Sequence, residues 1–104
     1  MEAALRAIAE PRRRQILTLV RGQELASGEI ASHFDVTGPA ISQHLTVLKA
    51  AGLVSERREG TRRLYRARPE GLASLREFLE ELWGDWLENL KTAAELEERR
   101  HRGR

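Results

Sequence analysis

One stretch with unusually clear helix boundaries, residues 37–53, constrains the fold of this chain more than any other. Thr37 is a favourable N-cap residue, Pro39 is tolerated in a first helical turn, and Gly52 suits the position just past a helix C-terminus. Apolar residues spaced by four and three predict one buried face on the helix between these ends: Ile41, Leu45 and Leu48. The stretch therefore predicts an amphipathic helix.

The opposite face of this helix carries short, uncharged hydrogen-bonding side chains with one cation behind them. Its residues are Gly38, Ser42, Gln43, Thr46 and Lys49. Such groups suit the donors and acceptors on the edges of DNA bases, whereas a merely solvated helix face more often carries Glu and Lys. We predict a DNA-recognition helix in which Ser42, Gln43 and Thr46 contact bases. Gly38 and Pro39 are expected to let its N-terminus approach the DNA.

The residues before this helix predict the rest of a helix-turn-helix motif. Residues 2–9 and 11–21 are expected to form two helices, the second ended by Gly22. A third helix is expected from an N-cap at Ser27 to residue 34, followed by a three-residue turn. Two helices joined by so short a turn, the second polar on its outer face, have the helix-turn-helix form.

A basic hairpin is predicted directly after this motif. Period-two alternation in residues 53–57 and 62–67 predicts two strands, with Gly60 in the turn. Arginines crowd its tip, as in the wing of a winged-helix protein. We expect basic residues of the second helix, the recognition helix and the wing to hold phosphates or the adjacent minor groove: Arg13, His44, Lys49, Arg58, Arg62 and Arg63. For His44 the alternatives are a base contact or a packed polar side chain, and at least two of the arginines at 12–14 could instead be simply solvated.

The last third of the chain predicts one long helix, from residue 70 to about residue 97. At 1.5 Å per residue it spans on the order of 40 Å, more than a small core can cover. Its broad apolar stripe includes both tryptophans of the chain: Leu79, Leu82, Trp83, Trp86, Leu87 and Leu90. Such a stripe favours a partner helix, most simply a second copy, over folding back onto the chain's own core. A glycine within a helix costs roughly 1 kcal/mol relative to alanine, so Gly84 needs a reason. We expect it to let the partner approach closely, and drift at an exposed site is the alternative.

The distribution of charge fits one domain, residues 1–98, with a charged tail at residues 99–104 that we expect to be disordered. Residues 1–68 carry 12 Lys and Arg against 7 Asp and Glu, whereas residues 69–98 carry 2 against 9. A basic front and an acidic back predict nucleic acid on one side and a protein contact on the other. Without a membrane-length apolar run or a signal pattern, we expect a cytoplasmic protein.

The sequence offers no catalytic or metal-binding constellation. It has no cysteine, which removes disulfides, thiolate metal sites and cysteine nucleophiles together. The histidines at positions 33, 44 and 101 lack the spacing of a helical metal site, and no serine lies in a nucleophile elbow. We therefore predict a protein that is not an enzyme and that needs no cofactor.

Taken together, these segments resemble the ArsR family of winged-helix repressors over nearly the whole chain. The matching segments, in the family's order and spacing, are residues 9–17, 28–31, 39–45, 47–54 and 57–65. The resemblance implies a homodimer formed by the first and last helices, with Leu5 and Ile8 in the interface. It also implies paired recognition helices and wings on an operator.

Two departures separate this chain from the metal sensors of that family. Metal-sensing members carry Cys-x-Cys early in the third helix, where this chain has Ala-Ser-Gly at residues 26–28. Others use Asp and His ligands on the last helix, where Asp85 is present but Leu87 replaces the expected histidine. Residues 78–86 are instead similar to the metal-independent branch that includes SdpR-like autorepressors.

We therefore expect a mainly helical winged helix-turn-helix fold with a small β-hairpin. The expected function is sequence-specific repression by a homodimer on a pseudo-palindromic operator in double-stranded DNA. A metal- or redox-responsive repressor of the same fold is one alternative, disfavoured by the lack of cysteine. A winged-helix module for protein interaction, without DNA binding, is the other, disfavoured by the basic wing and the polar helix face. The sequence leaves open whether a small molecule or a protein acts as inducer.

Overall fold

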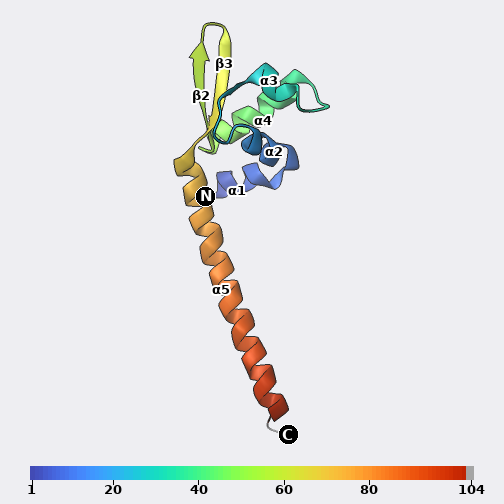
Figure 1. Cartoon of the computed structure of the whole chain (residues 1–104), viewed down its shortest axis with the longest axis vertical. Coiled ribbons are helices and arrows are strands. Elements are labelled where there is room, and N and C mark those ends of the chain that lie inside the picture. Colours follow the sequence, from blue (N-terminus) through green and yellow to red (C-terminus); the bar gives the residue numbers. More distant parts are fainter. Residues whose placement is uncertain (103–104) are drawn as a thin grey trace.

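A computed structural model describes residues 1–102 of the protein. Short helices and a small antiparallel sheet form a body at one end of a single long helix (Figure 1). The elements, in chain order, are α1 (Glu2–Ala9), α2 (Pro11–Leu19), β1 (Leu25–Ala26), α3 (Ser27–Ala31), α4 (Gly38–Ala50), β2 (Val54–Glu59), β3 (Arg62–Ala67) and α5 (Pro69–Arg102). The predicted winged helix-turn-helix fold, mainly helical with a small β-hairpin, is confirmed.

Helix α4 has the boundaries that its sequence predicts. The Thr37 hydroxyl accepts a hydrogen bond from the backbone N–H of Ala40 at 3.3 Å. Gly52, just past the C-terminus, takes a φ of +76°, a left-handed conformation that favours glycine. Both ends of the helix are therefore set by residues next to it in the sequence.

The predicted limits of α2 and α3 were wrong. Helix α2 ends at Leu19, because the carbonyl of Val20 turns to accept a hydrogen bond from the Ala67 N–H at 3.1 Å. Ser27 is the first residue of α3 rather than its N-cap, and the backbone N–H of the N-cap residue, Ala26, donates to the Glu29 carboxylate at 3.0 Å. Helix α3 then ends at residue 31 in tight turns, so the connection to α4 has six residues, 32–37, instead of three.

The hairpin belongs to a three-stranded sheet in the order β1-β3-β2. Strands β2 and β3 form the predicted hairpin with Gly60 at φ +64° in its turn, although β2 begins at Val54 and continues to Glu59, past the predicted end. Strand β1 was not predicted, because two residues show no periodicity. It forms only by pairing with β3, where Leu25 lies opposite Tyr65.

The hydrophobic core lies between the helices and the sheet, and it includes the predicted stripe of α4. Ile41, Leu45 and Leu48 are at most 1% exposed. They pack with buried side chains from α2, α3 and the start of the hairpin: Ile16, Val20, Ile30, Leu53 and Val54. Burying one such side chain stabilises the fold by about 1.5–3 kcal/mol. This burial fixes the rotation of α4 and turns its polar face outward.

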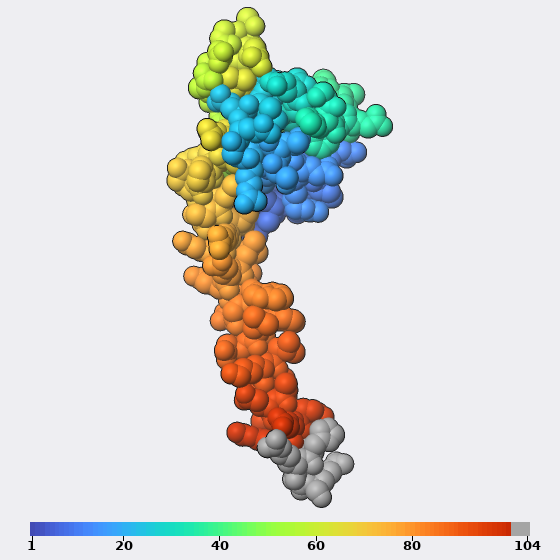
Figure 2. Space-filling model, in the orientation of Figure 1, coloured from blue at the N-terminus to red at the C-terminus, as the bar shows by residue number. Residues whose placement is uncertain are grey.

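Helix α5 begins against the body and then projects away from it (Figures 1 and 2). Leu75 is buried in its first turns, while every side chain from residue 79 to residue 100 is exposed. Its 34 residues span about 51 Å at 1.5 Å per residue. Most of the helix therefore has no contact with the chain's own core.

The end of α5 lies beyond its predicted limit. The helix continues to Arg102, into the segment 99–104 expected to be a disordered tail, because Glu, Leu and Arg are strong helix formers. Residues 103 and 104, and the side chains after residue 100, lie outside the described residues. The division between domain and tail at residue 98 stays a prediction. In the part of the chain that the structure describes, no helix is both long and apolar enough to span a membrane.

Candidate DNA-binding surface

The outer face of α4 presents the polar side chains predicted to contact bases. Ser42, Gln43 and Thr46 are exposed, as are Gly38 and Pro39 at the N-terminus of the helix. A Cβ at Gly38 would meet no atom within 4 Å, so this end is open to approach from outside. The Thr46 hydroxyl donates to the Ser42 carbonyl at 2.9 Å, which fixes its rotamer and leaves its lone pairs available as acceptors.

One further side chain on this face was missed from the sequence. Val47 is apolar, yet it is 38% exposed and lies one helical turn beyond Gln43. A valine methyl suits contact with the C5-methyl group of thymine. The spacing of four from Gln43 was the available signal in the sequence.

The C-terminal end of α4 is tied to the sheet through Glu56. Lys49 Nζ lies 3.4 Å from Glu56 Oε2, and the Tyr65 hydroxyl donates to the same oxygen at 3.1 Å. Burial alone would raise the pKa of Glu56, but these two hydrogen bonds hold its pKa below the ordinary value. Burial and the nearby carboxylate raise the pKa of Tyr65. Lys49 thus links the two elements while more than half of its side chain stays exposed.

Two arginines face each other on the wing, which we define as strands β2 and β3 with their turn. Arg58 and Arg63 are opposite residues of the antiparallel ladder, and both are exposed. Like charges directly opposite on neighbouring strands are destabilising, a local cost that a bound anion would remove. Arg62 is paired instead, with its guanidinium 2.8 Å from the Glu29 carboxylate on α3. The wing therefore carries a cationic pair and a link to the helix-turn-helix.

Arg57 has a structural role within the wing. Its guanidinium donates to both carboxylate oxygens of Glu24, at 3.0 and 2.6 Å, and to Glu59 at 2.9 Å. The hydrogen bond from Arg57 lowers the pKa of Glu24, against the opposing effect of burial. This fork fastens β2 to the loop that precedes β1. Sequence reasoning missed it, because 33 residues separate the partners.

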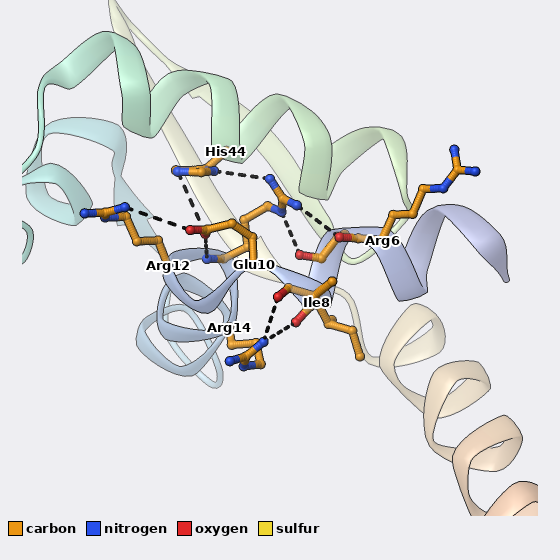
Figure 3. A network of polar contacts seen from close by, with 9 residues as sticks. Arg6, Ile8, Glu10, Arg12, Arg14 and His44 are labelled. Carbon is orange, nitrogen blue, oxygen red and sulfur yellow. Dashed lines mark hydrogen bonds and ion pairs between the residues drawn. The ribbon is translucent and has the colours of Figure 1, made fainter.

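Arg13 and His44, both expected to contact phosphate, lie in a polar network between α4 and the junction of α1 and α2 (Figure 3). The His44 side chain is only 19% exposed, with Nδ1 3.4 Å from an Arg13 nitrogen and Nε2 3.9 Å from Glu10. Arg13 also donates to the backbone carbonyls of Ala7 and Arg6, at 2.6 and 3.0 Å. The structure brings these two residues to each other rather than to the exposed face of α4. Their contact with DNA stays a prediction.

The residues predicted for a dimer interface fall into two groups. Leu5 and Ile8 on α1 are partly buried and pack against the core. Six apolar side chains on α5 are 42–59% exposed: Leu79, Leu82, Trp83, Trp86, Leu87 and Leu90. The rings of Trp83 and Trp86 stack with their centroids 4.9 Å apart. The alternative in which this helix folds back onto its own core is therefore wrong.

Gly84 does not share this apolar face. It lies about 60° around the helix beyond Leu87, the residue at the edge of this face, because successive helical residues are separated by about 100°. A Cβ at this position would meet no atom of the chain within 4 Å. The close approach expected at Gly84 therefore has no counterpart within the chain itself.

Residues with metal-binding side chains are scattered over the surface. Within the described residues, no three His, Asp or Glu side chains are grouped as an ion would require. Asp85 and Leu87, the positions compared with metal-sensing relatives, are both exposed on α5. The expected lack of a cofactor stays a prediction.

The sequence of the chain matches a family of bacterial regulators. Residues 10–56 match the family described as "Bacterial regulatory protein, arsR family". The chain is 46% identical over 82 residues to the HTH-type transcriptional regulator Rv2034 of Mycobacterium tuberculosis, covering 79% of this chain and 77% of that protein. It is 43% identical over 60 residues to the transcriptional repressor SdpR of Bacillus subtilis, covering 58% of this chain and 67% of that protein.

The fold has a close counterpart among solved structures. The solution structure of the homodimeric winged helix-turn-helix DNA-binding domain of Mb0332 from Mycobacterium bovis, a possible ArsR-family regulator, has a TM-score of 0.65 and 36% identity. The match covers 85% of this chain and 82% of that chain. With the helix-turn-helix, the wing and the sequence matches in agreement, the protein belongs to the ArsR family of DNA-binding transcriptional regulators and is not an enzyme.

Proposed function

We propose that this protein is a homodimeric repressor that binds a pseudo-palindromic operator in double-stranded DNA without a metal cofactor. The observation that carries the proposal is the exposed, uncharged face of α4 beside the cationic pair of the wing. Uncharged donors and acceptors suit base edges, whereas guanidinium groups suit phosphates and the minor groove. Occupying an operator would block access to the promoter. Such a protein works where the chromosome is, in the cytoplasm.

The surface has two groups of residues: one contacts bases and so specifies the DNA sequence, and the other contacts the DNA backbone and so positions the protein. Ser42, Gln43 and Thr46 contact bases in the major groove, and Gly38 and Pro39 let the N-terminus of α4 come close. Four basic side chains hold the DNA backbone: Lys49, Arg58, Arg62 and Arg63. Arg62 exchanges its carboxylate partner for phosphate at little cost, because exposed ion pairs contribute little to stability. Lys49 keeps its link to the largely buried Glu56 and meets phosphate with the exposed part of its side chain.

The dimer is formed by α1 and α5 in this proposal. The exposed apolar stripe of α5 needs a partner, and Leu5 and Ile8 on α1 lie on the body from which α5 projects. The homodimeric state of the Mycobacterium bovis domain supports this assembly. Gly84 is left out of the proposed interface, because it lies off the stripe.

Selection of bound duplexes from a random DNA pool tests the proposal. We expect enrichment of a symmetric motif whose half-site centres lie about one helical turn, 10–10.5 bp, or a multiple of it apart. The complex should contain two protein chains by sedimentation. Failure to enrich any motif at low salt would favour the alternative of a protein-interaction module.

The affinity for the selected duplex should depend steeply on salt. If the dimer neutralises roughly 6–10 phosphates, the association constant should fall by about 10³–10⁵ between 50 and 200 mM salt. In a plot of the logarithm of the association constant against the logarithm of the salt concentration, Arg58→Ala and Arg63→Ala should each make the slope less steep. A slope close to zero would contradict the assignment of the wing.

A further inference from the structure

The network beneath α4 uses Arg13 and Arg14 to cap α1 (Figure 3). Arg13 donates to the backbone carbonyls of Arg6 and Ala7 at 3.0 and 2.6 Å, and Arg14 donates to the next two carbonyls at 2.7 and 3.2 Å. These last four carbonyls are the ones that a helix end leaves without partners inside the helix. Cations there also interact favourably with the helix dipole. The two arginines of α2 therefore hold the C-terminal end of α1.

The Arg13 guanidinium also reaches the recognition helix, through Nδ1 of His44 at 3.4 Å. Arginine can only donate, so a hydrogen bond at this contact requires Nδ1 as the acceptor, and a neutral ring would then carry its proton on Nε2. Nε2 lies 3.9 Å from the carboxylate of Glu10, which also accepts from the Arg13 backbone N–H at 3.1 Å and so caps α2. His44 is thus held between a cation of α2 and an anion at the α1–α2 junction.

The same network disfavours a phosphate at this position. Burial alone would raise the pKa of Glu10, but the hydrogen bond from the Arg13 backbone N–H and the Arg12 guanidinium lower it, so Glu10 is ionised at neutral pH. A carboxylate beside His44 repels an incoming phosphate. Three nitrogens of the Arg13 guanidinium already donate within the protein. Only two of its five N–H groups are therefore left for another acceptor, and a phosphate there would lie close to the Glu10 carboxylate.

We propose that Arg13 and His44 are positioning residues, which couple the orientation of α4 to that of α1 and do not themselves bind phosphate. This assignment replaces the phosphate contacts expected from the sequence. The inference rests on the proposed function, in which α1 belongs to the dimer interface and α4 contacts the operator. Through this link, the geometry of the dimer sets the orientation in which each recognition helix meets its half-site.

The link itself is measurable in the full chain without DNA. Ring ¹⁵N chemical shifts of His44, recorded at about pH 8 in a His33→Gln, His101→Gln variant to simplify assignment, report which nitrogen carries the proton. We expect the Nε2–H tautomer. The Nδ1–H tautomer would overturn the proposal, because Nδ1 could then not accept from Arg13.

Two substitutions of His44 separate positioning from phosphate contact on the selected duplex. His44→Asn keeps an acceptor for Arg13, whereas His44→Lys places a second cation against it. Positioning predicts that His44→Asn binds within about threefold of the unsubstituted protein and that His44→Lys binds about tenfold more weakly or worse, both with an unchanged salt slope. Near-normal binding by His44→Lys, with weak binding and a reduced salt slope for His44→Asn, would overturn the proposal.

Thermal unfolding of each variant shows whether it folds. If His44→Lys does not fold, His44→Ala takes its place in the test. We expect His44→Ala to bind more weakly with an unchanged salt slope, and a reduced slope would overturn the proposal. Arg63→Ala is the matched control, whose slope should fall by about 0.9 for each phosphate that the protein no longer neutralises. If the unsubstituted protein selects no duplex, the proposed function fails, while the tautomer measurement still decides whether Arg13 and His44 are linked.

Discussion

Replacing Gly71 with alanine tests how α5 is joined to the helix-turn-helix. Gly71 lies in the first turn of α5, against the backbone that follows α4. A Cβ at residue 71 would overlap the carbonyl oxygen of Gly52 and lie 3.0 Å from its carbonyl carbon. The next residue, Leu53, is held by backbone hydrogen bonds to Leu48 at 3.0 Å and from Arg68 at 2.8 Å. No side-chain rotation can therefore relieve the overlap.

The expected cost follows from these contacts. Overpacking costs about 1–3 kcal/mol, and we expect about 3 kcal/mol because backbone atoms must move. Alanine returns about 1 kcal/mol through its higher helix propensity. The net loss of about 2 kcal/mol should lower the thermal midpoint by roughly 8–16 °C in a domain of this size. Circular dichroism at one fixed protomer concentration measures it, since the midpoint of a dimer depends on concentration.

Gly84→Ala is the matched control in the same helix. A Cβ at residue 84 meets nothing within 4 Å, so this substitution should stabilise the protein by about 1 kcal/mol. A Gly71→Ala protein as stable as the unsubstituted one would refute the close contact between α4 and α5. A Gly84→Ala protein with weakened dimerisation would instead return Gly84 to the interface.

Three further predictions concern the dimer, metals and pH. Trp86→Ala removes a large apolar side chain from the stripe of α5, which should destabilise the dimer by about 3–5 kcal/mol and weaken DNA binding. A variant that is still fully dimeric in sedimentation at micromolar concentration would contradict the assignment of the stripe to the dimer interface. Zinc, cadmium or arsenite at stoichiometric concentration should leave operator affinity unchanged, because the chain has no thiolate. A loss of DNA binding that a chelator reverses would support the metal-sensing alternative instead. The Arg57 hydrogen bond lowers the pKa of Glu24 from 4.5, so the ionised carboxylate stabilises the fold above that pH and its contribution is lost as pH falls through the lowered pKa. Glu24→Gln should therefore flatten the acid side of the stability profile from urea unfolding, and an unchanged profile would contradict the link between Glu24 and Arg57.

Local signals in the sequence were sufficient for the elements that carry the outer surface. Thr37, Pro39 and Gly52 act on the helix that they adjoin, and the spacing of its apolar residues determines which face is buried. The polar face of α4 could therefore be predicted before any tertiary contact was known. The exposure of the apolar stripe on α5 could be predicted from the length of the helix, because a small core cannot cover a helix of that length.

Features that depend on tertiary contacts could not be predicted in this way. Strand β1 exists only through its pairing with β3, and Gly71 is required only because Gly52 lies against it. The charge of Arg13 predicts a phosphate contact, whereas the hydrogen bonds of its guanidinium to the backbone carbonyls of Ala7 and Arg6 depend on how α1 and α2 pack together. Charge alone does not distinguish a cation that contacts DNA from one that caps a helix. The capping role can be recognised only when the positions of the backbone carbonyls at the end of α1 are known.

The central claim, that the outer face of α4 specifies the operator, is tested most directly through Gln43. Binding to every single-base variant of the selected duplex would be measured for the unsubstituted protein and for Gln43→Ala. We predict that Gln43→Ala loses about 1–3 kcal/mol of discrimination at one position in each half-site and keeps its preferences elsewhere. The same base preferences at every position in both proteins would contradict the claim, because they would mean that another surface selects the sequence.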